Sequence, residues 1–96
     1  FKVAEPAHIE EAIKRYSTLS QDAKKSGTPY IITASASPTH SDPRSQGYTL
    51  VVRTVFESKD DMDYYDNECA AHVEIKAMFK GKLGGPPLMV YMDMER

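Results

Sequence analysis

The first apolar pattern of the chain has the spacing of a helix. Pro6 suits the first turn of a helix, where its missing N–H would have no intrahelical partner. The apolar residues that follow recur every three or four positions, with charged residues between them: Ile9, Ala12, Ile13, Tyr16 and Leu19. This pattern predicts an amphipathic helix that begins near Pro6 and ends before the Gly-Thr-Pro sequence at 27–29.

Two segments rich in β-branched and aromatic residues follow this helix. Residues 30–37 predict a strand centred on Ile31, Ile32 and Thr33, and residues 48–57 predict a second strand with a clearer pattern. The sequence between them is rich in serine, proline and glycine. Because these residues interrupt regular structure, we expect a loop there.

An acidic helix and a last strand complete the pattern. Ser58 is a favourable N-cap, and Asp60 and Asp61 occupy the first turn, where the helix dipole favours negative charge. The helix is predicted to continue to Phe79, because glycines and prolines follow it. Residues 88–95 are rich in strand-forming side chains and predict the last strand.

The predicted order of elements is helix, strand, strand, helix, strand. Phe1 and Lys2 resemble the end of one more strand, and adding it gives the order βαββαβ of the ferredoxin-like fold. We therefore predict an α+β protomer whose first strand is truncated, with both helices on one face of an antiparallel sheet. Residues 1–96 are predicted to form a single domain.

The other face of this sheet needs a cover. Neither set of alternate residues in the 48–57 strand is cleanly polar, and the same holds for the 88–95 strand. A face washed by solvent would be mostly polar. We therefore expect a symmetric homodimer in which two sheet faces pack together. The alternative is a monomer with a few exposed apolar residues, which is common in soluble proteins.

Charge and composition limit the classes of partner. The formal net charge is −2 and no basic stripe runs along the chain, so we do not expect nucleic acid as a partner. No uncharged apolar run approaches the roughly 18 residues that span a bilayer, so we expect neither a membrane span nor a signal peptide. Cys69 is the single cysteine and cannot form an internal disulfide, which favours a reducing, cytoplasmic location.

Residues 56–72 combine acidic side chains with two tyrosines, the cysteine and a histidine. In a continuous helix, positions seven apart point within about 20° of each other, so Tyr65 and His72 would share one face. A neutral histidine can take a proton from an acidic carbon, and a tyrosine hydroxyl can stabilise the resulting enolate. The alternative is that His72 satisfies a buried carbonyl while Tyr65 packs its ring.

Other candidate sites in the sequence carry weaker signals. His8, His40 and His72 lack the spacing of metal ligands, so we expect no metal site. Arg44 could bind an anion, but the sequence around it favours a turn. The glycines at 81–85 lack the Lys-Ser/Thr ending of a phosphate-binding loop. Cys69 is expected to be a small inward-facing residue and not a reactive nucleophile.

The combination of segments resembles the stress-responsive dimeric α/β-barrel family, often called Dabb proteins. Residues 47–49 (Gly-Tyr-Thr) open a strand that ends in Phe-Glu-Ser at 56–58, which is similar to the central signature of that family. Tyr65 followed by Ala-His-Val at 71–73 is similar to its second helix, and Phe1-Lys2 to the end of its first strand. The likeness extends over nearly the whole chain, and it implies a ferredoxin-like protomer in a dimeric α/β barrel.

The resemblance also implies a site. One plant branch of the family contains a polyketide cyclase that closes an aromatic ring by aldol condensation without a cofactor. Its catalytic tyrosine and histidine correspond to Tyr65 and His72, and its pocket residues to Tyr16 and Val52. Six residues separate Tyr65 from His72 here, against five in that enzyme. The resemblance therefore implies a pocket for a small hydrophobic or polyketide-like ligand; the alternative is a non-catalytic stress-related or interaction protein whose pocket is filled.

Overall fold

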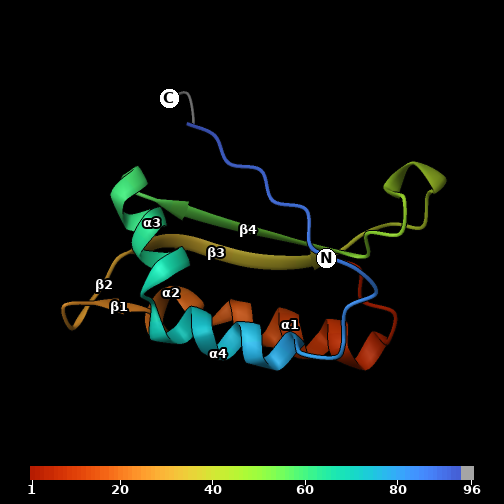
Figure 1. The fold of residues 1–96 in the computed structure, drawn as a ribbon, viewed down its shortest axis with the longest axis horizontal. Coiled ribbons are helices and arrows are strands. Elements are labelled where there is room, and N and C mark those ends of the chain that lie inside the picture. The colour runs from red at the N-terminus through yellow and green to blue at the C-terminus, as the bar shows by residue number, and fades with distance from the viewer. Residues whose placement is uncertain (94–96) are drawn as a thin grey trace.

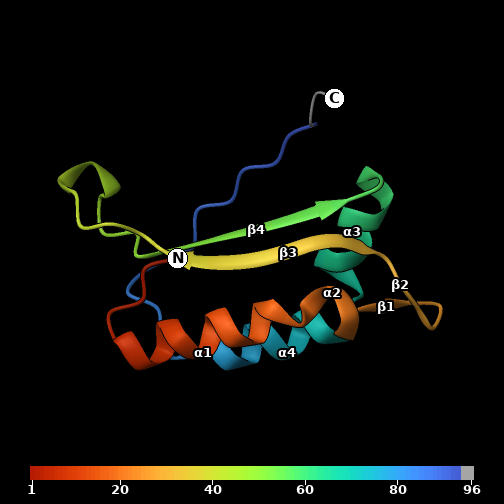
Figure 2. The same ribbon diagram turned by 180° about the vertical axis from the view of Figure 1, so that it is seen from behind.

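The computed structural model describes residues 1–93, and it contains a two-stranded antiparallel sheet above a layer of helices (Figure 1). Viewed from behind, the helices again lie on one side of the sheet, as predicted, with the shorter acidic helix at its end (Figure 2). The larger elements, in chain order, are α1 (Pro6–Ser17), α2 (Leu19–Asp22), β3 (Ile31–Pro38), β4 (Leu50–Phe56), α3 (Lys59–Asn67) and α4 (Ala70–Phe79).

The first helical unit confirms the predicted apolar stripe. α1 begins at Pro6, and its residues Ala12 and Tyr16 are buried. Thr18 separates α1 from the single turn of α2, where Leu19 is fully buried. The breaker sequence then forms a small hairpin that was not predicted, with strands β1 (Lys24–Lys25) and β2 (Thr28–Pro29).

The register of β3 and β4 decides which residues face the helices. Ala36 lies opposite Val52 and Ala34 opposite Thr54, and these pairs point toward the helical layer. The intervening pairs, such as Ser35 with Arg53, point to the other face. An irregularity in the pairing between Ile31 and Thr33 shifts the alternation at the start of β3.

The core lies between the sheet and the helices. It joins residues from every helix and from both long strands, and the N-terminal Val3 is part of it. None of the buried residues of the described chain is charged. The buried residues are Val3, Ala12, Tyr16, Leu19, Ala23, Ile31, Ala36, Leu50, Tyr65, Cys69, Ala71, Ile75 and Phe79.

The prediction of one continuous acidic helix was wrong. α3 begins at the expected N-cap, where the Ser58 hydroxyl accepts a hydrogen bond from the Asp61 N–H, but it ends at Asn67. The Asn67 side chain donates to the Asp63 carbonyl at 2.9 Å, and asparagine often competes in this way with backbone hydrogen bonds of a helix. Cys69 is then extended (φ −71°, ψ 119°) and precedes α4.

The predicted last strand at 88–95 was also wrong over the residues that the structure describes. Residues 88–93 are assigned to no strand, and residues 94 and 95 of the prediction lie outside the described part of the chain. Five consecutive large apolar residues, Leu88 to Met92, are 66% to 74% exposed. A strand needs partners for its backbone N–H and C=O groups. The nearest β-bridge joins Leu83 to Val3, and Leu83 precedes this segment.

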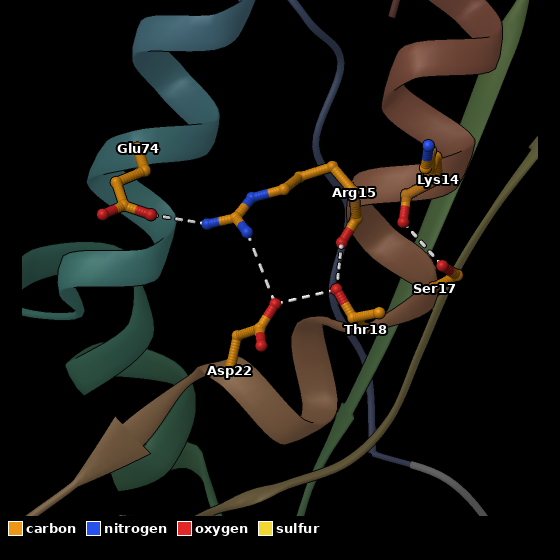
Figure 3. Close-up of polar contacts among 6 residues, drawn as sticks. All are labelled: Lys14, Arg15, Ser17, Thr18, Asp22 and Glu74. Atoms are coloured by element: carbon orange, nitrogen blue, oxygen red, sulfur yellow. Dashed lines mark hydrogen bonds and ion pairs between the residues drawn. The ribbon is translucent and has the colours of Figure 1, made fainter.

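An arginine fastens α1 to α4 on the side of the helical layer that is turned from the sheet. The Arg15 guanidinium makes ion pairs with Glu74 of α4 and, at 3.3 Å, with Asp22 of α2 (Figure 3). Asp22 also accepts a hydrogen bond of 2.7 Å from the Thr18 hydroxyl. Because these groups are partly exposed, their main effect is to orient the helices, and each pair stabilises the fold by at most about 1 kcal/mol.

Candidate functional site

The Tyr65 and His72 side chains meet at the junction of α3 and α4. Their rings stack with centroids 3.9 Å apart and an interplanar angle of 11°. The break between the helices explains this contact, because a continuous helix would separate the two residues by about 10 Å along its axis. The sequence therefore predicted that the pair shares a side of the structure, but not that the rings touch.

A hydrogen bond fixes the orientation of the His72 ring. Its Nδ1 lies 2.8 Å from the backbone carbonyl oxygen of Tyr65. A carbonyl oxygen can only accept, so Nδ1 carries the proton in this bond. In the neutral ring, Nε2 is therefore the nitrogen with a free lone pair, which is the arrangement that a general base requires.

The same hydrogen bond has a structural role at the end of α3. The last carbonyls of a helix have no partner within it. Here the Tyr64 carbonyl accepts from the backbone N–H groups of Glu68 and Cys69, the Tyr65 carbonyl from His72, and the Asp66 carbonyl from the Lys76 ammonium. His72 thus helps to join α3 to α4, independently of any chemistry at Nε2.

The surroundings of His72 favour its neutral form. The side chain is half-buried, and this desolvation lowers the pKa of His72, with a further contribution from the positive charge of Lys76. The bond to the Tyr65 carbonyl and the charge of Asp66 act in the opposite direction. A neutral imidazole near pH 7 can accept a proton, so the ring is in the state that base catalysis needs.

Tyr65, which stacks on this ring, and Tyr16 are both buried phenols. Tyr16 and Tyr65 are only 2% and 6% exposed, and a hydrogen bond between their hydroxyl groups contributes to the pKa of each. Desolvation raises the pKa of Tyr16 to about 12 and raises the pKa of Tyr65 as well. Both hydroxyls therefore remain protonated at neutral pH; one O–H donates within the pair, and the other can donate to a further partner.

The sheet supplies the wall opposite these tyrosines. Val52 is half-buried and packs against the core, and the Phe56 ring lies 5.4 Å from the Tyr65 ring. Tyr30 was not singled out by the sequence analysis, yet its ring packs against Phe56, and its hydroxyl is buried without a hydrogen-bond partner in the described chain. The signal for it was its position, because Tyr30 directly precedes β3, whose first residue Ile31 pairs with Phe56.

Two open concavities of the described chain lie away from these residues. One, of about 600 Å³, is lined by acidic residues of α3 with Lys25 and Tyr64. Another, of about 490 Å³, lies between α1 and α4 around Arg15 and Met78. The four predicted site residues line neither of them: Tyr16 and Tyr65 are buried in the core, Val52 packs against it, and His72 stacks on Tyr65.

The weaker candidates are accounted for by local contacts. The Asp42 carboxylate accepts from the Arg44 backbone N–H at 2.8 Å and pairs with its guanidinium, so the turn is confirmed. Cys69 is buried, as expected. Within residues 1–93, no three histidine, cysteine or acidic side chains are grouped as metal ligands would be, and no helix is long and apolar enough to span a membrane.

The free energy of unfolding is expected to decrease as the pH falls below about 6.5, the ordinary pKa of histidine. Because burial lowers the pKa of His72 in the folded state, the unfolded chain binds this proton first. The contribution of His72 is therefore complete above that pH and is lost as the pH falls toward the folded-state pKa.

Urea unfolding of the wild type and of His72→Asn between about pH 8 and pH 5 measures this effect. His8 and His40 are present in both proteins, so their effects cancel in the difference. The wild type should lose stability relative to the variant on acidification. A difference that does not change with pH would show that His72 titrates normally in the folded state.

Comparison with known proteins identifies the family to which this chain is similar. The family model described as "Stress responsive A/B Barrel Domain" matches residues 1–94. A "Fusaristatin A biosynthesis cluster protein" of Gibberella zeae is 37% identical over 76 residues, which is 79% of this chain and 55% of that protein. The chain thus spans about half the length of this curated relative. No solved structure matches the chain significantly.

Proposed function

Because the chain belongs to the stress-responsive A/B barrel (Dabb) family, we propose that it is a small biosynthetic protein that binds a hydrophobic ligand between its sheet and helices. The relative from Gibberella zeae is named a biosynthesis cluster protein, which supports a biosynthetic role. The observation that carries the proposal is His72, whose Nδ1 is held by the Tyr65 carbonyl while Nε2 keeps its lone pair and the ring stacks on the protonated phenol of Tyr65.

The reaction that fits these groups is a cofactor-free aldol cyclisation. His72 Nε2 removes a proton from a carbon between two carbonyl groups, and the Tyr65 hydroxyl donates a hydrogen bond to the enolate oxygen. The enolate carbon then forms a bond to the carbon of another carbonyl group, outside that pair and further along the same substrate. The alkoxide that results takes the proton back from His72, so the step needs neither an oxidant nor a metal.

A second candidate function is a non-catalytic role in stress or protein interaction. Tyr16 and Tyr65 are buried by the protein's own side chains, and His72 joins α3 to α4 through the Tyr65 carbonyl. These contacts favour a filled pocket, in which the three residues stabilise the fold and bind no ligand.

A thermal-shift screen with linear poly-β-ketones and with their cyclised phenol products tests the ligand. A ligand at 100 times its Kd should stabilise the chain by about 2.7 kcal/mol, which for a domain of this size raises the Tm by on the order of 10 °C. Tyr65→Phe is the matched control, because it removes one donor and keeps the ring. The shift should be smaller in this variant.

The two candidate functions give different results in this screen. Equal Tm shifts in the wild type and in Tyr65→Phe would show that the Tyr65 hydroxyl does not contact the bound ligand. If none of the compounds shifts the Tm of the wild type, the ligand-binding proposal fails and the non-catalytic role is favoured.

The homodimer through sheet faces is a further part of this proposal. The face of β3 and β4 turned from the helices carries Val51, which is 57% exposed, and the half-buried Val55. The serines of β3 and Arg53 lie on the same face, so it is mixed in polarity. A second copy would cover the two valines and leave the polar groups to pair across the interface.

Val51→Asp or Val55→Asp is expected to weaken this dimer, because each would bury an unpaired charge between the sheets. Light scattering at micromolar concentration measures the mass. The control is Val73→Asp, because Val73 is 60% exposed and belongs to α4 and not to the sheet. If the wild type has the mass of one chain at that concentration, the dimer is excluded.

A further inference from the structure

The hydroxyl group of Tyr30 points into the protein, although the residue as a whole is partly exposed. Its oxygen is buried and has no hydrogen-bond partner in the described chain. A partly exposed tyrosine usually keeps its polar tip in water while its ring packs against the protein. The inverted orientation leaves an unpaired donor inside the fold, which destabilises the fold unless a further group pairs with it.

Aromatic contacts hold the Tyr30 side chain in this orientation. The Phe56 ring stacks on the Tyr30 ring with centroids 6.1 Å apart, and the Tyr64 ring meets it edge to face at 5.3 Å and 87°. These two contacts come from β4 and from α3, so a rotation of the side chain would disturb both elements. The inward direction of the hydroxyl is therefore built into the packing.

The groups around this hydroxyl leave it free to donate. Desolvation raises the pKa of Tyr30, and the Cys69 thiol raises it further, so the hydroxyl keeps its proton at neutral pH. The thiol is near enough to influence this pKa, but it makes no hydrogen bond of regular geometry with the hydroxyl. A thiol is also a weak hydrogen-bonding group, so an oxygen acceptor would pair better with Tyr30.

Tyr30 belongs to the same buried cluster as Tyr65. The Phe56 ring packs on Tyr30 and lies 5.4 Å from the Tyr65 ring, so it contacts both tyrosines. Burial is the main cause of the raised pKa of Tyr65, and the electrostatic influence of neighbouring groups, Tyr30 among them, adds to it. The two phenols are therefore close enough to act on one ligand.

We propose that the Tyr30 hydroxyl donates a hydrogen bond to a second oxygen of the ligand, on the carbonyl group that the enolate attacks. This inference rests on the proposed function, whose reaction develops negative charge on two oxygens in turn. The Tyr65 hydroxyl stabilises the enolate oxygen, and the attacked carbonyl oxygen needs a donor of its own as it becomes an alkoxide. Tyr30 supplies that hydrogen bond and transfers no proton, since the proton that the alkoxide takes comes from His72.

Cyclisation of a linear tetra-β-ketone with methyl ends tests this inference. Initial rates are measured for the wild type, Tyr30→Phe and Tyr64→Phe, and each is compared with the uncatalysed rate. Tyr64→Phe is the matched control, because the Tyr64 ring packs on Tyr30 while its hydroxyl is already paired with the Lys24 carbonyl at 3.2 Å. Thermal unfolding without substrate gives the Tm of each protein.

Tyr30→Phe should lower kcat by about 10²-fold, the usual effect of removing one donor to a developing oxyanion, and should change KM little. Its Tm without substrate should not fall below that of the wild type, because the hydroxyl has no partner in the fold to lose. Tyr64→Phe should keep the kcat of the wild type.

The other outcomes overturn the inference in distinguishable ways. If Tyr30→Phe cyclises the tetraketone as fast as the wild type, the Tyr30 hydroxyl has no part in the reaction, while the proposed function stands. Equal losses of kcat in Tyr30→Phe and Tyr64→Phe would assign the effect to ring packing. A Tm of Tyr30→Phe several degrees below that of the wild type would show that the hydroxyl is paired within the fold. If the wild type does not exceed the uncatalysed rate, the proposed cyclisation fails, and the role of Tyr30 fails with it.

Discussion

Replacing His72 by alanine is expected to lower the Tm by several degrees. The substitution leaves the Tyr65 carbonyl without its donor and removes the ring that stacks on Tyr65. The loss of a buried hydrogen bond costs about 1–3 kcal/mol, and each kcal/mol changes the Tm of a domain this small by roughly 4–8 °C. Thermal unfolding followed by circular dichroism measures the change.

His72→Asn is the matched variant, because its side-chain amide can donate to the Tyr65 carbonyl as Nδ1 does, whereas it has no counterpart of the basic Nε2. It should recover much of the stability lost in His72→Ala. If both variants have the same Tm as the wild type, the hydrogen bond and the stacked rings contribute little to the stability of the fold. The structural role assigned to His72 would then be wrong.

The same pair of variants separates catalysis from stability. With a ligand from the screen that is also turned over, His72→Asn should keep the fold and lose turnover, because it lacks a base. Tyr65→Phe should slow the reaction by about 10²-fold, the usual effect of removing one donor to a developing oxyanion. A folded His72→Asn that retains full turnover would exclude His72 as the base.

Periodicity predicted the helical layer because burial follows it closely. Ala12, Tyr16 and Leu19 were expected on one face and are all buried. The helix-facing side of β4 could not be predicted in this way, because neither alternate set of that strand is cleanly polar; in the structure Leu50 is buried and Val51 is exposed. In the first helical unit, the spacing of apolar residues decides which side meets the core.

The break in the acidic helix could not be predicted in this way. Residues 58–79 have helix signals at both ends, and Cys69 lies on the same apolar stripe as Tyr65. The break is accompanied by hydrogen bonds between α3 and α4, which the Tyr65 and Asp66 carbonyls accept from His72 and Lys76. Such tertiary contacts override local helix propensity.

The prediction of the last strand was wrong for a related reason. Residues 88–93 have a suitable composition, but composition supplies no partner for the backbone, and the pairing with residues 1–3 ends at Phe1. The candidate site was predicted as a set of residues, since the resemblance identified Tyr16, Val52, Tyr65 and His72. Their packing, and the contribution of Tyr30 and Phe56, depends on the register of β3 and β4.

Leu50→Ala is expected to have the largest effect on stability of the substitutions considered. Leu50 is 1% exposed, and its side chain lies between the sheet and the helices at the point where β4 pairs with Phe1. Truncating a buried leucine to alanine costs about 2–5 kcal/mol, through lost burial and the cavity that remains. The Tm should therefore fall by on the order of 10 °C or more, as measured by thermal unfolding.

Val73→Ala is the control, because Val73 is 60% exposed on α4, and losing its methyl groups should change the stability by less than about 0.5 kcal/mol. The comparison also tests which face of β4 meets the helices, since a slip of the strand by one residue would exchange Leu50 with Val51. If Leu50→Ala is as mild as Val73→Ala, then Leu50 faces solvent, and Val52 and Phe56 face away from Tyr65 as well. The candidate site would then lose its sheet wall, because all three β4 residues lie on one face of the strand.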